Sequence, residues 1–125
     1  MPQTDHPKLT APQSEMLVLS VLADEASYGY AVTKAIAARS DGAFRLGPGQ
    51  LYPLLSKLEK AGLVSTSWEE IKASGSDPDA QGRRRKWYRI TDKGCKRLEQ
   101  RVESHRRLTA LIESFLSPGK REVSA

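Results

Sequence analysis

Three scarcities in this chain exclude whole classes of protein. The 125 residues include one cysteine, Cys95, so the chain forms no internal disulfide and suits a reducing cytoplasm. The histidines are only His6 and His105, and no metal-ligand spacing surrounds them. No apolar run approaches the length that spans a membrane. We therefore expect a cytoplasmic protein that has no metal site and does not enter a membrane.

Motifs for catalysis are also missing. No nucleophile motif is present, and the segment Gly47-Pro48-Gly49 lacks the Lys-Ser/Thr that completes a phosphate-binding loop. The segment Asp77-Pro78-Asp79 is too short for a calcium loop. The sequence therefore predicts no enzyme, no catalytic residue and no cofactor.

Positive charge is plentiful by comparison. The formal net charge is +5 and the sequence pI is near 9.5, which favours a polyanionic partner. Four basic residues stand together at 83–86, in a segment that we expect at the tip of a hairpin. A solvated charge run is the usual interpretation of such a cluster in isolation. Beside a helix with a polar outer face, DNA binding becomes the leading hypothesis.

Two helices are predicted in the first third of the chain. The first runs from Thr10 to Ala23 and is apolar on most sides, with Thr10 and Gln13 spaced as a capping box. The second runs from Tyr28 to Ser40, with Ser27 as its expected cap.

A third helix begins near Pro48, a residue suited to a first turn, and ends at Gly62, expected as a left-handed cap. Its apolar residues recur at helical spacing, while its other face is polar. The apolar residues are Leu51, Leu54, Leu55 and Leu58.

A hairpin follows the third helix. Alternation predicts one strand at Val64–Ile71 and a second at Trp87–Ile90, with a polar tip at Ala73–Gly82. A polar-faced helix beside a basic hairpin is the arrangement of a winged helix-turn-helix. The predicted fold class is thus mainly α with a small β hairpin, a winged helix-turn-helix plus a long C-terminal dimerisation helix.

The predicted organisation divides the chain into four parts. Residues 1–8 form a disordered N-terminus and residues 9–91 the DNA-binding domain. Residues 92–117 form the C-terminal dimerisation helix, which Thr91 caps, and residues 118–125 a disordered tail.

The last helix, Asp92 to about Leu116, is roughly 35–40 Å long. A body this small cannot cover its apolar seam, so a second subunit is the economical cover. The predicted dimer-interface residues are Leu98, Val102, His105, Leu108, Leu111, Ile112 and Phe115. His105 on this seam can titrate near neutral pH, or it is simply a tolerated polar residue at the seam edge.

These motifs together resemble the PadR family of bacterial transcriptional regulators, in its short form with one C-terminal helix. The matching segments are Tyr28-Gly29-Tyr30, Gly47-Pro48-Gly49-Gln50-Leu51-Tyr52-Pro53-Leu54-Leu55, Leu58-Glu59-Lys60-Ala61-Gly62-Leu63-Val64 and the hairpin return from Gly82 to Gly94. The resemblance covers roughly Leu9 to Leu116. It implies a homodimer that binds a near-palindromic double-stranded DNA operator, usually as a repressor, and a small-molecule effector near the dimer interface.

The residues expected to contact DNA come from three segments. They are Gly49, Gln50, Tyr52, Ser56 and Lys57 in the third helix, Arg83, Arg84, Arg85 and Lys86 before the second strand, and Ser27, Tyr30 and Lys34 around the second helix. Gln50 is the candidate for reading an adenine by two hydrogen bonds. For Gln50 and Lys57 the alternative is a solvated helix face, and for Tyr52 it is a half-buried packing ring.

A second function also fits the sequence. The same winged helix can serve as a protein–protein interaction module in which the basic run at 83–86 binds an acidic partner. A third, weaker hypothesis is a small-molecule binder whose main site is the dimer interface. Retention on random DNA, compared with an acidic protein, separates the first two.

Overall fold

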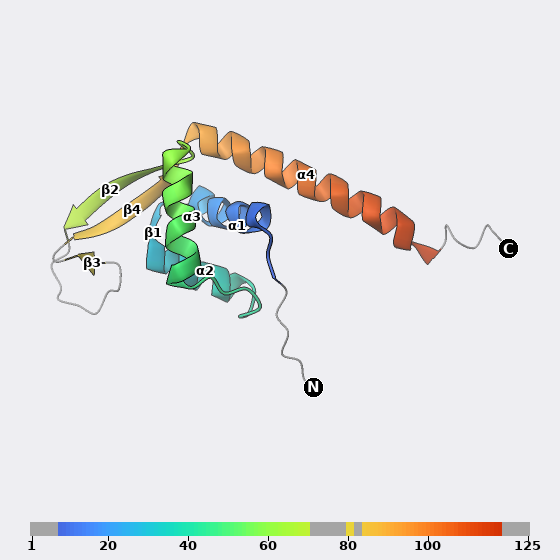
Figure 1. Cartoon of the computed structure of the whole chain (residues 1–125), viewed down its shortest axis with the longest axis horizontal. Coiled ribbons are helices and arrows are strands. Elements are labelled where there is room, and N and C mark those ends of the chain that lie inside the picture. The colour runs from blue at the N-terminus through green and yellow to red at the C-terminus, as the bar shows by residue number, and fades with distance from the viewer. Residues whose placement is uncertain (1–7, 71–79, 82–83, 119–125) are drawn as a thin grey trace.

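The computed structural model describes residues 8–70, 80–81 and 84–118 of the chain (Figure 1). The predictions for residues 1–7, for most of the hairpin tip, for Arg83 and for residues 119–125 lie outside these residues. The elements in order are α1 (Ala11–Asp24), β1 (Ser27–Tyr28), α2 (Gly29–Arg39), α3 (Pro48–Lys60), β2 (Val64–Glu70), β3 (Ala80–Gln81), β4 (Arg84–Ile90) and α4 (Asp92–Leu116).

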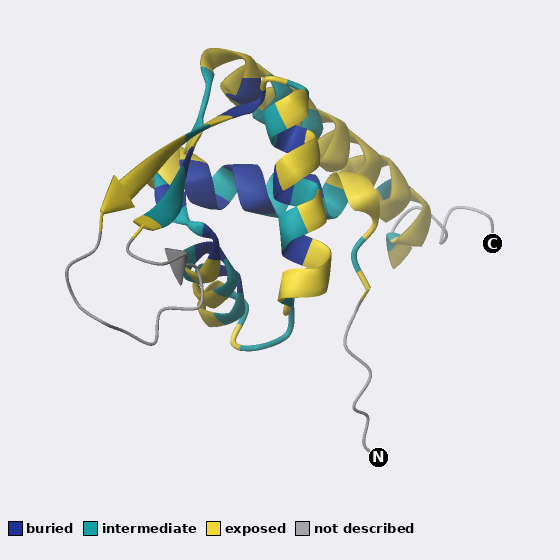
Figure 2. Ribbon diagram, turned by 60° about the vertical axis from the view of Figure 1, so that its left-hand side comes forward, coloured by how far each residue is buried: buried dark blue, intermediate teal, exposed yellow. Residues whose placement is uncertain are grey.

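The core lies between the first three helices and the inner face of the small sheet (Figure 2). The largest fully buried side chains are Leu19, Leu22, Leu51, Leu55, Leu58, Leu63, Val18 and Val32. Burial of this apolar set is the main force that holds the helices together. The predicted fold class, a winged helix-turn-helix followed by a long C-terminal helix, is confirmed.

Capping explains where α1 begins. The Gln13 N–H donates to Thr10 Oγ1 at 3.3 Å, and the Thr10 N–H donates to Gln13 Oε1 at 2.8 Å, which confirms the capping box. The prediction for α2 was wrong in detail. Its N-cap is Tyr28, without a side-chain bond, and the Ser27 hydroxyl instead donates to the Glu25 carbonyl at 3.3 Å.

The end of α3 follows the predicted glycine cap. Gly62 has φ +79°, and the Leu63 N–H donates to the Leu58 carbonyl at 2.9 Å. These features, together with the Gly62 N–H donating to the Glu59 carbonyl at 3.0 Å, form a Schellman motif. This tight turn leads directly from α3 into β2. The hairpin of β2 and β4, called the wing below, therefore lies beside α3.

The antiparallel sheet has the strand order β1-β4-β2, with β3 also paired to β4. The two-residue strand β1 was not predicted. The second strand of the hairpin is longer than expected, because Arg84, Arg85 and Lys86 belong to β4 and not to a loop before it. They pair opposite Glu70, Glu69 and Trp68, respectively.

Helix α4 has the predicted bounds and the predicted cap, since the Gly94 N–H donates to Thr91 Oγ1 at 2.9 Å. Its first half packs against α1, and its second half extends away from the body (Figure 1). Within the described residues, no helix is long and apolar enough to cross a membrane. The same residues include no group of three or more His, Cys, Asp or Glu that could hold a metal ion.

Candidate nucleic-acid interface

One face of α3 is exposed along the whole helix (Figure 2). Its exposed positions are Pro48, Gly49, Gln50, Pro53, Ser56, Lys57 and Lys60. Leu51, Leu55 and Leu58 on the opposite face are buried. The buried face fixes the helix on the core, while the polar face is open to solvent along its length.

Gly49 in the first turn of α3 is not required by the packing of this chain. A Cβ built on Gly49 would meet nothing within 4 Å. Glycine in a helix costs roughly 0.5–1 kcal/mol relative to alanine. The packing of the free protein would therefore accept a side chain at position 49.

Gln50 is engaged within its own helix. The Gly47 N–H donates to Gln50 Oε1 at 3.1 Å, so the side chain folds back over the helix start. A two-bond contact with adenine needs both the oxygen and the nitrogen of the amide. Base reading by Gln50 therefore requires this capping bond to open when DNA binds.

Tyr52 is half-buried and packs between α3 and α2. A Cβ on Gly29 would lie only 2.7 Å from Tyr52 Cε1 and from its hydroxyl oxygen. The structure thus places Tyr52 in the packing role that the sequence left open. It also explains why a glycine follows Tyr28, since any side chain there would displace the Tyr52 ring.

The α2 candidates differ in accessibility. Tyr30 and Lys34 are exposed, and Lys34 Nζ lies 5.4 Å from the centre of the Tyr30 ring. Ser27 is buried, with 7% of its surface exposed, and its strand pairs with β4. This burial leaves Ser27 unsuited to a phosphate contact.

The wing face that adjoins α3 carries two of the basic residues. Thr66 Oγ1 donates to Glu59 Oε2 at 2.9 Å, and Lys86 Nζ lies 3.4 Å from Glu59 Oε1, which ties this face to α3. Arg84 is exposed and stacks over the ring of Trp68, with 4.7 Å between Cζ and the ring centre. Glu59 partly compensates Lys86, and Arg84 is the more exposed of the two basic residues on this face.

The opposite wing face holds the third basic residue. Arg85 stacks over Tyr28, with 4.2 Å from Cζ to the ring centre, and Trp87 meets the same ring edge-on at 5.6 Å. Trp87 Nε1 donates to Glu69 Oε1 at 2.7 Å. Because strand residues alternate between faces, Arg84 and Lys86 lie on one face of β4 and Arg85 on the other.

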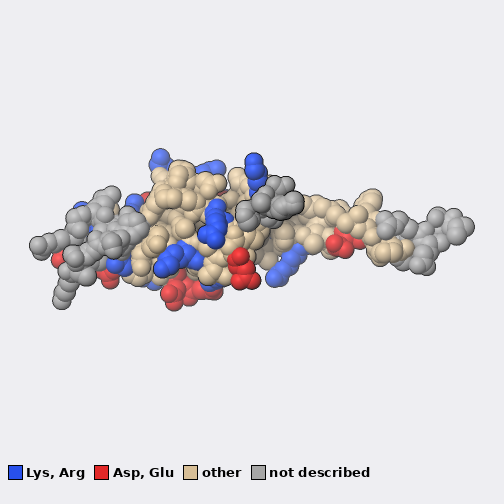
Figure 3. Space-filling view, turned by 90° about the horizontal axis from the view of Figure 1, so that it is seen from below, with Lys and Arg blue, Asp and Glu red and all other residues tan. Residues whose placement is uncertain are grey.

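The second half of α4 exposes most of its predicted seam. The exposed fractions are 58% for Leu108 and Leu111, 48% for Ile112 and 74% for Phe115. His105 is exposed beside them, Val102 is half-buried, and Leu98 packs against the core of its own subunit. On the face shown in Figure 3, the part of the molecule that extends from the body carries few charged side chains.

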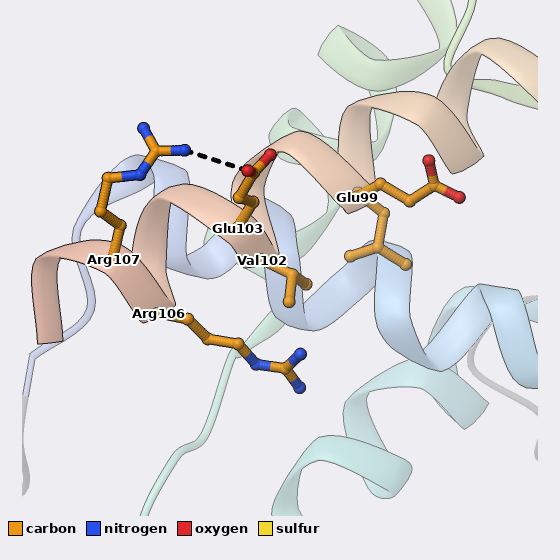
Figure 4. Close-up of a pocket in the computed structure, with 6 residues that line it drawn as sticks. Glu99, Val102, Glu103, Arg106 and Arg107 are labelled. Atoms are coloured by element: carbon orange, nitrogen blue, oxygen red, sulfur yellow. Dashed lines mark hydrogen bonds and ion pairs between the residues drawn. The ribbon is translucent and has the colours of Figure 1, made fainter. Parts of the chain in front are cut away.

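A groove of about 660 Å³ runs along the middle of α4. Its lining residues are Leu98, Glu99, Val102, Glu103, Arg106 and Arg107. Figure 4 shows Glu103 and Arg107 joined by an ion pair on one side of the helix, with Val102 and Arg106 on the other. The groove therefore has an apolar floor, and charged side chains of both signs border it.

Comparisons with known proteins bear on this geometry. Residues 18–100 match the family model described as "Transcriptional regulator PadR-like family". A protein of Streptococcus mutans UA159 is similar in structure, with a TM-score of 0.72 and 31% identity over 91% of this chain and 95% of its own. A transcriptional regulator from Clostridium thermocellum has a TM-score of 0.70 and 27% identity over 85% and 95% of the two chains. For a PadR family regulator from Eggerthella lenta DSM 2243 the values are 0.64 and 30%, over 84% and 85%.

Proposed function

Because the chain belongs to the PadR-like family of transcriptional regulators, we propose that it is a homodimeric repressor of a near-palindromic operator, released by a small effector. The family regulates transcription through DNA and is not enzymatic. The exposed seam supports the homodimer and hence the operator symmetry, the groove on α4 supports the effector, and repression is what the resemblance to the family implies.

The exposed face of α3 beside the Arg84–Trp68 stack is the observation that carries the proposal. In this arrangement Gly49, Ser56 and Lys57 lie in the major groove. Arg84 reaches the adjacent phosphates, and Trp68 holds its guanidinium in place by stacking. Tyr30 and Lys34 approach the flanking backbone from α2.

The exposed seam on α4 supports the homodimer. Leu108, Ile112 and Phe115 would each bury apolar surface if a second copy of α4 packed on them. An interface related by a twofold axis presents two equal α3 helices, and these match an operator whose half-sites are inverted repeats. Such a protein on a promoter blocks access of the transcription machinery.

The groove along α4 is the proposed place for an effector. The groove shares Leu98 and Val102 with the predicted dimer-interface residues, so a small molecule bound there would lie at the edge of the proposed interface. The charges of Arg106 and Glu99 at its border would orient a small molecule that has an apolar body and a polar end. Binding there would alter how the two helices pack and hence how the α3 helices are placed on DNA.

Replacing Arg84 with alanine tests the phosphate contact. We expect binding to operator and to random DNA to weaken by similar factors, because a phosphate contact carries no sequence information. The slope of log affinity against log salt should become shallower by about 0.9 for each subunit's lost contact. Fluorescence anisotropy titrations at several salt concentrations measure both quantities.

Arg39→Ala is the matched control for this experiment. It removes the same charge, but Arg39, at the end of α2, already pairs with Asp24 at the end of α1. Its salt slope should equal that of the wild type. A slope that is unchanged in Arg84→Ala, or equally reduced in both variants, would contradict the contact.

A further inference from the structure

Helix α4 is attached to the body at two places, and the first is its own N-terminus (Figure 1). Thr91 Oγ1 donates to the Gly62 carbonyl at 2.7 Å, and Lys93 Nζ donates to the Ala61 carbonyl at 2.8 Å. A Cβ on Gly94 would lie only 2.1 Å from the Leu63 carbonyl oxygen. Glycine therefore lets the first turn of α4 sit directly on the turn that ends α3, and this contact acts as a pivot.

The second attachment is a clamp made of Glu15 from α1 and two arginines from α4. Arg101 Nε donates to Glu15 Oε2 at 2.9 Å, and its Nη2 reaches Oε1 at 3.5 Å. Arg97 Nη1 donates to the same Oε2 at 3.3 Å. Glu15 itself has only 7% of its surface exposed.

These contacts favour the charged, carboxylate form of Glu15. Burial raises the pKa of the Glu15 carboxyl, but the hydrogen bonds and charges of Arg101 and then Arg97 lower it below its usual range overall. A carboxylate held by a planar guanidinium fork has a defined direction as well as a defined distance. Apolar contacts such as that of Leu98 with the core lack this directionality.

We propose that the clamp of Glu15, Arg97 and Arg101 sets the number of base pairs between the two half-sites that the dimer accepts. The inference rests on the proposed homodimeric operator binding. The pivot fixes one point of α4, and the clamp fixes a second point about 10 Å further along the helix. Two fixed points define the direction in which α4 leaves the DNA-binding body.

Small changes in this direction have large effects at the far end of the helix. From Gly94 to Leu116 the helix is about 33 Å long. A tilt of about 6° at the pivot moves the far end by about 3.4 Å, the rise of one base pair. The exposed seam lies in that far half, so the tilt changes the separation of the two α3 helices directly.

Binding to operators of different spacing tests the proposal. The probes are duplexes with two inverted half-sites, obtained by selection with the wild-type protein, whose spacers are shortened or lengthened by one or two base pairs. In Glu15→Gln we expect the preference for the best spacer over its neighbours to fall about threefold to tenfold. Affinity for a duplex with a single half-site should not change, because α3 is not altered.

Two further variants keep the test independent of folding defects. Arg101→Lys retains a positive charge beside Glu15 but lacks the guanidinium fork, so it should also relax the preference. Asp24→Asn removes the same charge from the same helix as Glu15→Gln, but from the exposed pair with Arg39, and should leave the preference as in the wild type. Thermal unfolding and light scattering establish that each variant is folded and dimeric.

The outcomes are distinct. Relaxed spacing in Glu15→Gln and Arg101→Lys, with the wild-type preference kept in Asp24→Asn, supports the clamp. A wild-type spacing preference in both clamp variants overturns it and leaves the proposed function intact. If the wild type binds no paired half-sites at any spacing, the proposed function itself is overturned, and the role of the clamp with it.

Discussion

A Leu108→Glu variant is expected to be monomeric and to lose operator binding. Leu108 is 58% exposed in one subunit and lies within the seam on which the dimer is proposed to form. Because a twofold interface contains each residue twice, the substitution places two carboxylates in apolar surroundings. We expect the dimer dissociation constant to rise about a hundredfold or more, equivalent to about 2.7 kcal/mol. Operator affinity falls with it, since each monomer then binds one half-site alone.

Light scattering and operator titration of the same samples measure both effects. The matched control is Ala110→Glu, which adds the same charge to an exposed position two residues along α4. At 100° per residue, Ala110 lies nearly opposite Leu108 on the helix, so this variant should remain dimeric and bind the operator. Tight operator binding by a monomeric Leu108→Glu protein would refute the dimer model.

A Gly49→Ala variant is expected to be more stable than the wild type and to bind DNA more weakly. The added methyl group meets nothing within 4 Å in the free protein. Alanine also reduces the conformational entropy that folding must overcome, which stabilises the protein by about 0.4–1 kcal/mol. In the complex the methyl group occupies the space into which DNA is proposed to fit. We expect an affinity loss of about tenfold, equivalent to about 1.4 kcal/mol.

The opposite signs of these two effects make the result decisive. A general folding defect would lower both the melting temperature and the affinity, so it cannot imitate the expected pattern. Chemical denaturation and operator titration are the two measurements. A stabilised Gly49→Ala protein with wild-type affinity would show that DNA does not approach the start of α3 closely.

Local signals explain why much of the fold could be predicted from the sequence. Thr10 with Gln13, Gly62 at a positive φ and Thr91 before α4 all act through bonds to residues within a few positions. The apolar period of α3 reports burial directly, as the buried faces of Leu51 and Leu55 confirm.

The features that sequence reasoning missed depend on distant partners. Strand β1 exists because Ser27 and Tyr28 pair with β4, and two residues alone carry no strand pattern. The basic residues at 84–86 are part of β4 because they pair with residues 68–70 of β2, and their side chains contact Trp68, Tyr28 and Glu59 of other elements. Glu15 and Arg101 are 86 positions apart, and no local pattern connects them.

The candidate site was predicted in outline but not in the roles of its members. The sequence located the polar face of α3 and the basic run. It could not show that the Gln50 oxygen accepts the Gly47 N–H, or that Tyr52 fills the space over Gly29. Both roles follow from the way α3 meets its neighbours, so only the packed structure separates a groove contact from a structural one.

Selection of DNA from a random duplex library by the purified protein tests the central claim most directly. The account predicts enrichment of one sequence with two inverted half-sites at a fixed spacing. Binding to that sequence should weaken steeply as salt rises. Uniform, weak binding without an enriched sequence would contradict operator recognition and favour a winged helix that uses its basic face for another partner.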